Sequence, residues 1–446
     1  MLIRYFHGLF IYTLCMIRKA FLLISTLSLS LPMAPVSAAP MTSSSCIDAG
    51  VTSKASGTTI PCISSAEKFV LSQGVKVTPT SKPKPNKVSL NPIPITLPVS
   101  QSGAFTFSNI VHNADEIPRA AWNSVQSAVT MNAPASVTNV VAIGPNTTPN
   151  VPKASVLTGL QNVQKVFSGF TQPKTFTSLI WSYPDLKWTK DWVKKNTSAS
   201  PYIRRINDDF LNCTAIRCGG LGAGPVSMQG YGFEDFVLSP RFLNDPFFSS
   251  GAAQPKEYIL VTEAAQFIKH PKVGTFPGGP NDALNNIAPC WLRQGTALYN
   301  GAAALNISFG DFLSVRNENA LGQSDPKFND YSASSLESFF KNDVAPACNP
   351  ENVFGPDYEI GELTVETLVA IAGPESVMAL FALMGNGQTF DSAFKNVYNI
   401  SWSKAMPTLA KTVAVGFTNL WTATNCTTPS TGCNPTLVNP FPGGTS

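Results

Sequence analysis

Charged side chains are scarce in this sequence, since aspartate, glutamate, lysine and arginine make up only 13% of its 446 residues. The formal net charge at pH 7 is +4. It would fall by three, to +1, if Arg4, Arg18 and Lys19 were removed with an N-terminal leader. A protein so close to neutrality has no general electric field that would attract nucleic acid or anionic membranes. We therefore expect no nucleic-acid partner.

Histidine is scarcer still, with only His7, His112 and His270 in the whole chain. Serine hydrolysis needs a histidine base beside the nucleophile, and the sequence has no Gly-x-Ser-x-Gly elbow. It also has no Cys-x-x-Cys pair, the usual element of a thiolate metal site. These shortages disfavour serine hydrolases and cysteine-ligated metal centres.

The N-terminus has the pattern of an export signal. Arg18 and Lys19 precede an apolar run over residues 20–31, and Val36-Ser37-Ala38 supplies the small residues that a signal peptidase requires. The pattern predicts a signal peptide over residues 1–38 and a secreted or cell-envelope protein. The alternative is an uncleaved membrane anchor, which would be the only contact with a membrane, because no other stretch is apolar for long enough to span one.

Eight cysteines remain beyond the leader, and an even number in an exported chain suggests disulfides. Sequence alone cannot settle their connectivity. Closeness along the chain favours three local pairs and leaves a fourth, namely Cys46–Cys62, Cys213–Cys218, Cys426–Cys433 and Cys290–Cys348.

Composition and hydrophobic spacing predict an α+β protein. The 36 prolines and 31 glycines argue against a wholly helical chain. We expect a small N-terminal mixed or antiparallel sheet with helices, followed by a mainly helical C-terminal subdomain. The predicted segments are a signal peptide (1–38), a small disulfide-closed segment (39–75), a proline-rich linker (76–100), an N-terminal α/β subdomain (101–256), a helical subdomain (257–420) and a tail (421–446).

Periodicity places individual elements in the N-terminal subdomain. Helices are predicted at 115–130, at 153–170 and from residue 185 onwards. Strands are predicted at 137–143 and 175–183, and the glycine-bounded region 219–232 is predicted to be a hairpin or edge strand.

Two later segments carry a recognisable frame. The first reads Leu260-Val261-Thr262-Glu263-Ala264-Ala265-Gln266-Phe267, and the second reads Pro289-Cys290-Trp291-Leu292-Arg293-Gln294-Gly295-Thr296-Ala297-Leu298-Tyr299. Together they resemble the gluzincin zinc metallopeptidases, whose pattern is His-Glu-x-x-His, an insertion, then Trp-Leu-x-Glu-Gly-x-Ala-x-Tyr. The likeness extends over about residues 100–415, including a helix-like stretch at 358–369, and it implies the gluzincin fold.

The resemblance also shows what has changed. Thr262, Gln266 and Gln294 stand where the family has its two histidines and its glutamate. Three neutral oxygen donors bind Zn²⁺ poorly, so we predict no metal and no cofactor. Glu263 keeps the position of the general base, but without a metal it has no activated water. We expect it to be a cleft or surface carboxylate paired locally. His270 lies one turn beyond Gln266, and we expect it at the C-terminus of that helix.

Other residues are weaker candidates. Trp291, Tyr299 and Tyr358 could line a cleft together with the three former ligand positions, although aromatic residues at helical spacing usually belong to the core. The carboxylates of Glu359, Glu362 and Glu366 share one helix face and could suggest glycoside chemistry. A solvated or partly buried helix face explains them more simply.

The sequence therefore predicts an exported, catalytically inactive metallopeptidase homologue that binds a peptide or protein ligand. One alternative is a working peptidase that holds zinc through unusual ligands, perhaps His270 and Glu263. Another is a structural envelope protein in which side chains close the cleft.

Overall fold

A four-stranded sheet forms the centre of the N-terminal part of the fold. The computed structural model describes residues 52–55, 58–65, 68–71, 86–89, 94–99, 104–196, 220–224, 227–238, 246–305, 307–322, 328, 330–343 and 356–423. The sheet strands are β6 (Thr138–Ile143), β7 (Thr175–Ser182), β8 (Gly220–Gly224) and β9 (Tyr231–Leu238). Their order is β6-β7-β9-β8; the first three run parallel, and β8 lies antiparallel to β9 at one end.

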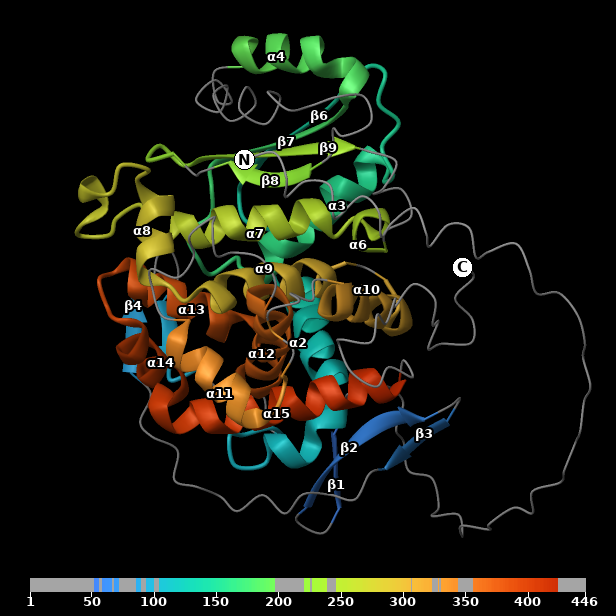
Figure 1. Ribbon diagram of the computed structural model, residues 1–446, viewed down its shortest axis with the longest axis vertical. Coiled ribbons are helices and arrows are strands. Elements are labelled where there is room, and N and C mark those ends of the chain that lie inside the picture. Colours follow the sequence, from blue (N-terminus) through green and yellow to red (C-terminus); the bar gives the residue numbers. More distant parts are fainter. Residues whose placement is uncertain are drawn as a thin grey trace, which may run out of the picture. The chain divides into compact units, whose positions relative to one another are not determined.

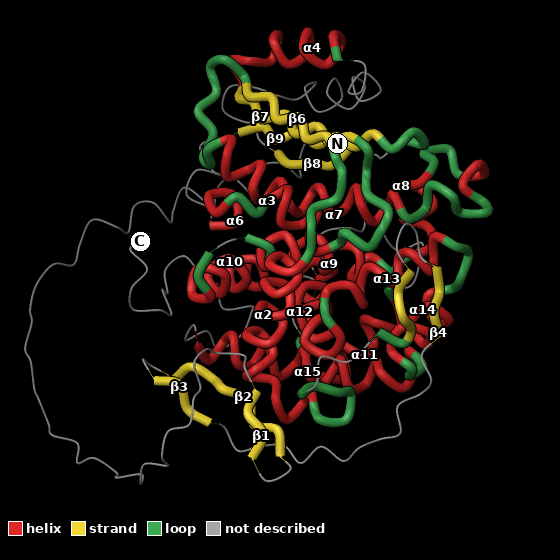
Figure 2. The backbone as a smooth tube through the Cα atoms, turned by 180° about the vertical axis from the view of Figure 1, so that it is seen from behind, coloured by secondary structure: helices red, strands yellow, loops and turns green. Residues whose placement is uncertain are grey.

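Helices cover both faces of this sheet (Figure 1). On one face lies α4 (Leu186–Lys195), where Val193 packs with Leu179, Trp181, Phe233 and Val237 of the strands. On the other face lie α3 (Lys153–Val166) and α7 (Ala253–Ala265). The same three layers are seen from behind in Figure 2.

The helix α7 is buried on all sides, with Lys256 its only residue that is not. Val261 faces the sheet so closely that a Cβ on Gly232 would lie 2.4 Å from its Cγ1. The helix is enclosed because the sheet covers one side of α7 while a second helix, α9 (Cys290–Ala303), packs on the opposite side.

The rest of the described chain is mainly helical. Its 3-10 segments and helices are η2 (Ile110–Glu116), α2 (Ile117–Met131), η3 (Tyr183–Asp185), α6 (Pro246–Ser250), η6 (Val273–Thr275), α8 (Pro280–Ile287), α10 (Phe309–Gly322), α11 (Ala333–Asn342), α12 (Pro356–Ala372), α13 (Pro374–Gly385), α14 (Phe390–Tyr398) and α15 (Trp402–Ala423). α9 lies between α7 and α12, so it has two distinct packing faces.

Glycines fix how closely α9 approaches each neighbour. A Cβ on Gly295 would lie 2.1 Å from the carbonyl oxygen of Gly361 in α12, and a Cβ on Gly301 would lie 3.0 Å from the backbone of Lys256 in α7. Any larger side chain at Gly295 would force α9 and α12 apart.

Five short strands precede the sheet. They are β1 (Thr52–Ala55), β2 (Thr58–Ser65), β3 (Lys68–Leu71), β4 (Asn86–Ser89) and β5 (Pro94–Leu97). The predicted linker thus contains the antiparallel β4–β5 pair, and the N–H of Val99 donates to the carbonyl of Val397, 3.0 Å away. The predicted signal peptide and the tail beyond residue 423 lie outside the described residues.

The α+β architecture confirms the predicted class in its coarse form, a small sheet with helices followed by a mainly helical region. The predicted helices near 115–130, 153–170 and 185 and the strands near 137–143 and 175–183 are all present, although α3 ends at Val166. The sequence did not reveal the whole of β9, which runs from Tyr231 to Leu238.

Within the described residues, no single helix is long and apolar enough to cross a membrane. The pair α12 and α13 reaches that length and apolarity together, but it is bent by 107° at the break between the helices.

Candidate functional site

Thr262 and Gln266 share one face of α7, as their spacing predicts, and both side chains form bonds within the protein. The Thr262 hydroxyl donates to the carbonyl of Tyr258 at 2.9 Å. The Gln266 amide donates to the carbonyls of Thr262 at 2.8 Å and Thr171 at 2.6 Å. Two of these bonds are local to the helix, and the bond to Thr171 links it to a distant segment of the chain.

Gln294 lies on the face of α9 that packs against α7. It lies seven residues before Gly301, so the two occupy one helix face, and Gly301 packs on Lys256 of α7. Arg293 lies close enough to Glu263 to influence its charge, which places the first turn of α9 beside the last turn of α7. Gln294 is buried, and its amide oxygen has no hydrogen-bond partner among the described residues.

Glu263 is fully buried, and neither carboxylate oxygen has a hydrogen-bond partner in the described part of the chain. Burial raises the pKa of Glu263 well above its ordinary value, and the positive charges of Arg293 and Lys256 offset only part of that shift. Burial thus disfavours the charged form of this side chain. The expectation of a locally paired cleft or surface carboxylate is wrong, because the sheet and α9 enclose α7.

Two further carboxylates lie near this crossing, and neither was among the predicted site residues. Glu234 enters from β9 beside the hydroxyl of Ser178, and burial together with the charge of Glu257 raises its pKa well above the usual range. Glu257 itself pairs with the ammonium of Lys256 at 2.8 Å. The available signal was the apolar sequence on both sides of Glu234-Asp235, which fits a buried strand.

Little free volume exists beside Gln266. A cavity of about 40 Å³ lies beside Gln266, bounded by Thr171, Ala265 and Lys269 and by Ala382 and Asn386 of the α13 end. That volume accommodates water and not a peptide side chain. In the described residues, no group of three or more histidine, cysteine, aspartate or glutamate side chains could hold a metal ion.

The predicted aromatic cleft residues do not join the ligand positions. Trp291 points from another face of α9 and stacks on Trp402, with ring centroids 5.5 Å apart. Tyr299 packs edge-on against Phe312 at 6.0 Å. Tyr358 lies on α12, where the ammonium of Lys256 is 5.9 Å from its ring centroid. The three aromatic residues therefore belong to three separate surroundings.

His270 does not end a helix, because α7 already ends at Ala265. The imidazole lies between the rings of Phe267 and Phe276, and its Nδ1 accepts the N–H of Lys272 at 3.2 Å. Burial, with the charge of Lys272, lowers the pKa of His270, so the ring is neutral at pH 7. This corrects the expectation of a positive charge at a helix C-terminus.

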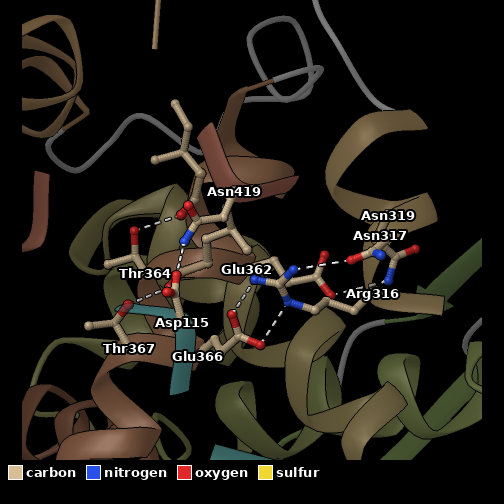
Figure 3. A network of polar contacts seen from close by, with 11 residues as sticks. Asp115, Arg316, Asn317, Asn319, Glu362, Thr364, Glu366, Thr367 and Asn419 are labelled. Atoms are coloured by element: carbon tan, nitrogen blue, oxygen red, sulfur yellow. Dashed lines mark hydrogen bonds and ion pairs between the residues drawn. The ribbon is translucent and has the colours of Figure 1, made fainter. Parts of the chain in front are cut away.

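The acidic face of α12 is buried, not solvated (Figure 3). Arg316 of α10 binds Glu366 through two bonds of 2.8 and 2.6 Å, and the hydroxyl of Tyr331 donates to Glu359. Among the described residues the one hydrogen-bond donor to Glu362 is the Asn319 amide, at 3.4 Å, and burial raises the pKa of Glu362 to about 8. The expectation of a solvated or partly buried face is wrong because α10 covers it.

Comparisons with family models, with curated proteins and with solved structures found no match to this chain. Cys290 is buried at the start of α9, and its predicted partner Cys348 lies outside the described residues. That pairing stays a prediction, as do the other three.

Proposed function

We propose that this protein is a non-catalytic relative of the gluzincin peptidases, exported from the cell, that binds a peptide or protein ligand. The resemblance in sequence supplies the family. The element order supports it, since a mixed sheet with one antiparallel end strand precedes the helix pair α7 and α9.

The observation that carries the loss of catalysis is that Thr262 and Gln266 are engaged by backbone carbonyls while Glu263 is buried. Neither oxygen of Glu263 has a hydrogen-bond partner among the described residues, and burial raises its pKa. A general base must be ionised and must reach its proton, and burial of Glu263 opposes both requirements.

The binding role rests on β8. In the described part of the sheet this strand pairs only with β9, so its second edge offers N–H and C=O groups to an added strand. Three of its five residues are glycine, which lets another backbone approach closely. Extended peptides commonly bind by extending a sheet in this way.

The proposed relationship to the gluzincin family can be tested by introducing the family's metal ligands at the three matching positions. The variant Thr262→His/Gln266→His/Gln294→Glu should bind zinc, and saturating zinc at about 100 times the Kd should raise its free energy of unfolding by about 2.7 kcal/mol. The variant Thr262→His/Gln266→His, which lacks the third ligand, serves as the control and should bind more weakly. A folded triple variant that zinc does not stabilise would show that these positions do not superpose on the family site.

Peptide binding can be tested with proline at adjacent positions of β8. Successive N–H groups of a strand point to opposite edges, so one of Gly222→Pro and Ala223→Pro removes a bond to β9 and the other removes an outward donor. Amide exchange in β9 identifies which is which. We expect the outward variant to lose binding to a peptide library while β9 stays protected. Equal binding by this variant and the unaltered chain would exclude sheet extension.

A second candidate is a purely structural envelope protein, which the enclosure of Thr262, Glu263 and Gln294 favours. It predicts that no member of an extended-peptide library binds the purified chain at any concentration where the protein stays folded.

A further inference from the structure

A second cavity lies in the helical region, where α9, α11, α14 and α15 meet. Its volume is about 390 Å³, and its walls include four aromatic rings, those of Trp291, Phe340, Phe390 and Trp402. Pockets that bind small molecules measure roughly 300–1,000 Å³ and are lined mainly by apolar and aromatic side chains. The cavity has the size and the lining of such a pocket.

The aromatic walls are fixed by contacts with one another. The Trp402 ring stacks on Trp291 with an interplanar angle of 16°. It also makes edge contacts with Phe340, Phe390 and Phe394, at centroid distances of 5.7, 5.2 and 5.1 Å. A ligand entering this pocket would meet preformed walls, so little ordering of side chains would oppose binding.

The charged groups at the rim already have counterparts. The Lys341 ammonium pairs with Glu337 at 2.7 Å. The Asp343 carboxylate accepts the N–H of Trp291 at 3.0 Å and also bonds to the carboxyl group of Asp357. Because these partners are in place, a charged ligand would lose its hydration without gaining an unpaired counter-ion.

Asp391 completes the rim, and it stands in the first turn of α14. A negative charge there is favourable because the helix N-terminus carries a partial positive charge. The helix N-terminus thus already stabilises the Asp391 charge, which reduces what a cation would gain there, and the one lysine of the described lining is paired.

We propose that this pocket binds a small uncharged aromatic molecule. The site is built from α9, α11, α14 and α15, whereas the proposed peptide edge is on β8, so either function can exist without the other.

The test compares three two-ring probes of similar size on the full chain by calorimetry and equilibrium dialysis. They are naphthalenemethanol, which is uncharged, naphthylmethylamine, a cation, and naphthalenecarboxylate, an anion. We expect the alcohol to bind with one-to-one stoichiometry and roughly tenfold more tightly than either ion. If none of the three binds, or if an ion binds as tightly as the alcohol, the proposal is overturned.

Variants locate the bound probe. Ser403 lines the exposed rim, so Ser403→Phe should fill the mouth and weaken alcohol binding roughly tenfold without disturbing the core. Trp402→Leu should weaken it at least as much if the variant folds. The control is Trp188→Leu, because Trp188 is a half-buried tryptophan of α4 on the far face of the sheet. Unchanged binding by Ser403→Phe would exclude this pocket.

Discussion

The two helices that flank α9 each carry a buried carboxylate, and the surroundings of the two carboxylates differ. On α7, Glu263 has no hydrogen-bond partner among the described residues, and burial raises its pKa. On α12, Glu366 receives two bonds from the guanidinium of Arg316 and lies 2% exposed. Burial is nearly the same at both sites, so the difference between them is the direct pairing with an arginine.

The comparison shows that one helix can lie between two buried carboxylates with opposite surroundings. At the α12 site the Arg316–Glu366 pair ties α10 to α12. At the α7 site no hydrogen bond reaches Glu263 from the described residues, and burial disfavours its charged form. The predictions below test this difference.

The largest expected effect follows from Arg316→Met. It leaves Glu366 buried without its partner, and breaking such a pair costs about 3–5 kcal/mol in the free energy of unfolding. Urea unfolding measures this change. The control is Lys187→Ala, which breaks the exposed Lys187–Asp191 pair and should change nothing measurable. A loss below about 1 kcal/mol for Arg316→Met would show that the pair is not a stabilising link.

The next effect concerns pH. The pKa of Glu263 is raised on folding, so the folded protein binds a proton that the unfolded chain releases above a pKa of 4.5. Stability from this group is complete at lower pH and falls as pH rises toward the raised pKa, by about 1.4 kcal/mol per pH unit. Glu263→Gln cannot ionise, so it should match the unaltered protein at pH 4 and exceed its free energy of unfolding at pH 8. Equal pH profiles for the two proteins would mean that Glu263 is ionised and paired.

Packing around α9 provides the third prediction. Gly295→Ala places a Cβ against the carbonyl of Gly361, so α9 and α12 must separate at a cost of about 1–3 kcal/mol. Gly169→Ala is the matched control, because a Cβ there meets nothing within 4 Å. Thermal unfolding of the two variants should differ clearly, and equal melting temperatures would contradict the close approach of α9 and α12.

The smallest effect compares two threonines. Thr262 of α7 and Thr364 of α12 are both fully buried, and each hydroxyl donates to the carbonyl four residues earlier, at 2.9 and 2.6 Å. Thr262→Val and Thr364→Val should each cost about 0.5–1.5 kcal/mol. A much larger loss for Thr262→Val would indicate that the Thr262 hydroxyl stabilises the fold more than the Thr364 hydroxyl does.

The sequence predicted the helices and strands that are determined by the local spacing of apolar residues. Helix α2 and strands β6 and β7 follow from regular spacing of apolar residues. Strand β9 was predicted only in part because Glu234-Asp235 interrupts its apolar sequence, and the apolar residues on both sides were the one local sign that Glu234 is buried.

The residues of the candidate site could be picked out from the sequence, but their burial and their contacts could not. The spacing of Thr262 and Gln266 predicted their shared face, which the structure confirms through the bond from Gln266 to the Thr262 carbonyl. The burial of Glu263 depends on the sheet and α9, and that of Glu366 depends on Arg316, fifty residues earlier. Such long-range contacts leave no signal in a single sequence.

The contact between Gly295 and Gly361 has a consequence for how sequence motifs are read. Gly295 belongs to the Trp-Leu-x-x-Gly frame, yet its role in this structure is to let two helix backbones touch. The contact requires a glycine at this position, and it would do so whether or not the protein catalysed a reaction. A sequence search that gives such glycines a high weight will therefore find proteins that share this helix packing. Only the residues at the metal-ligand positions of a motif can distinguish an enzyme from a protein that has the same fold and no activity.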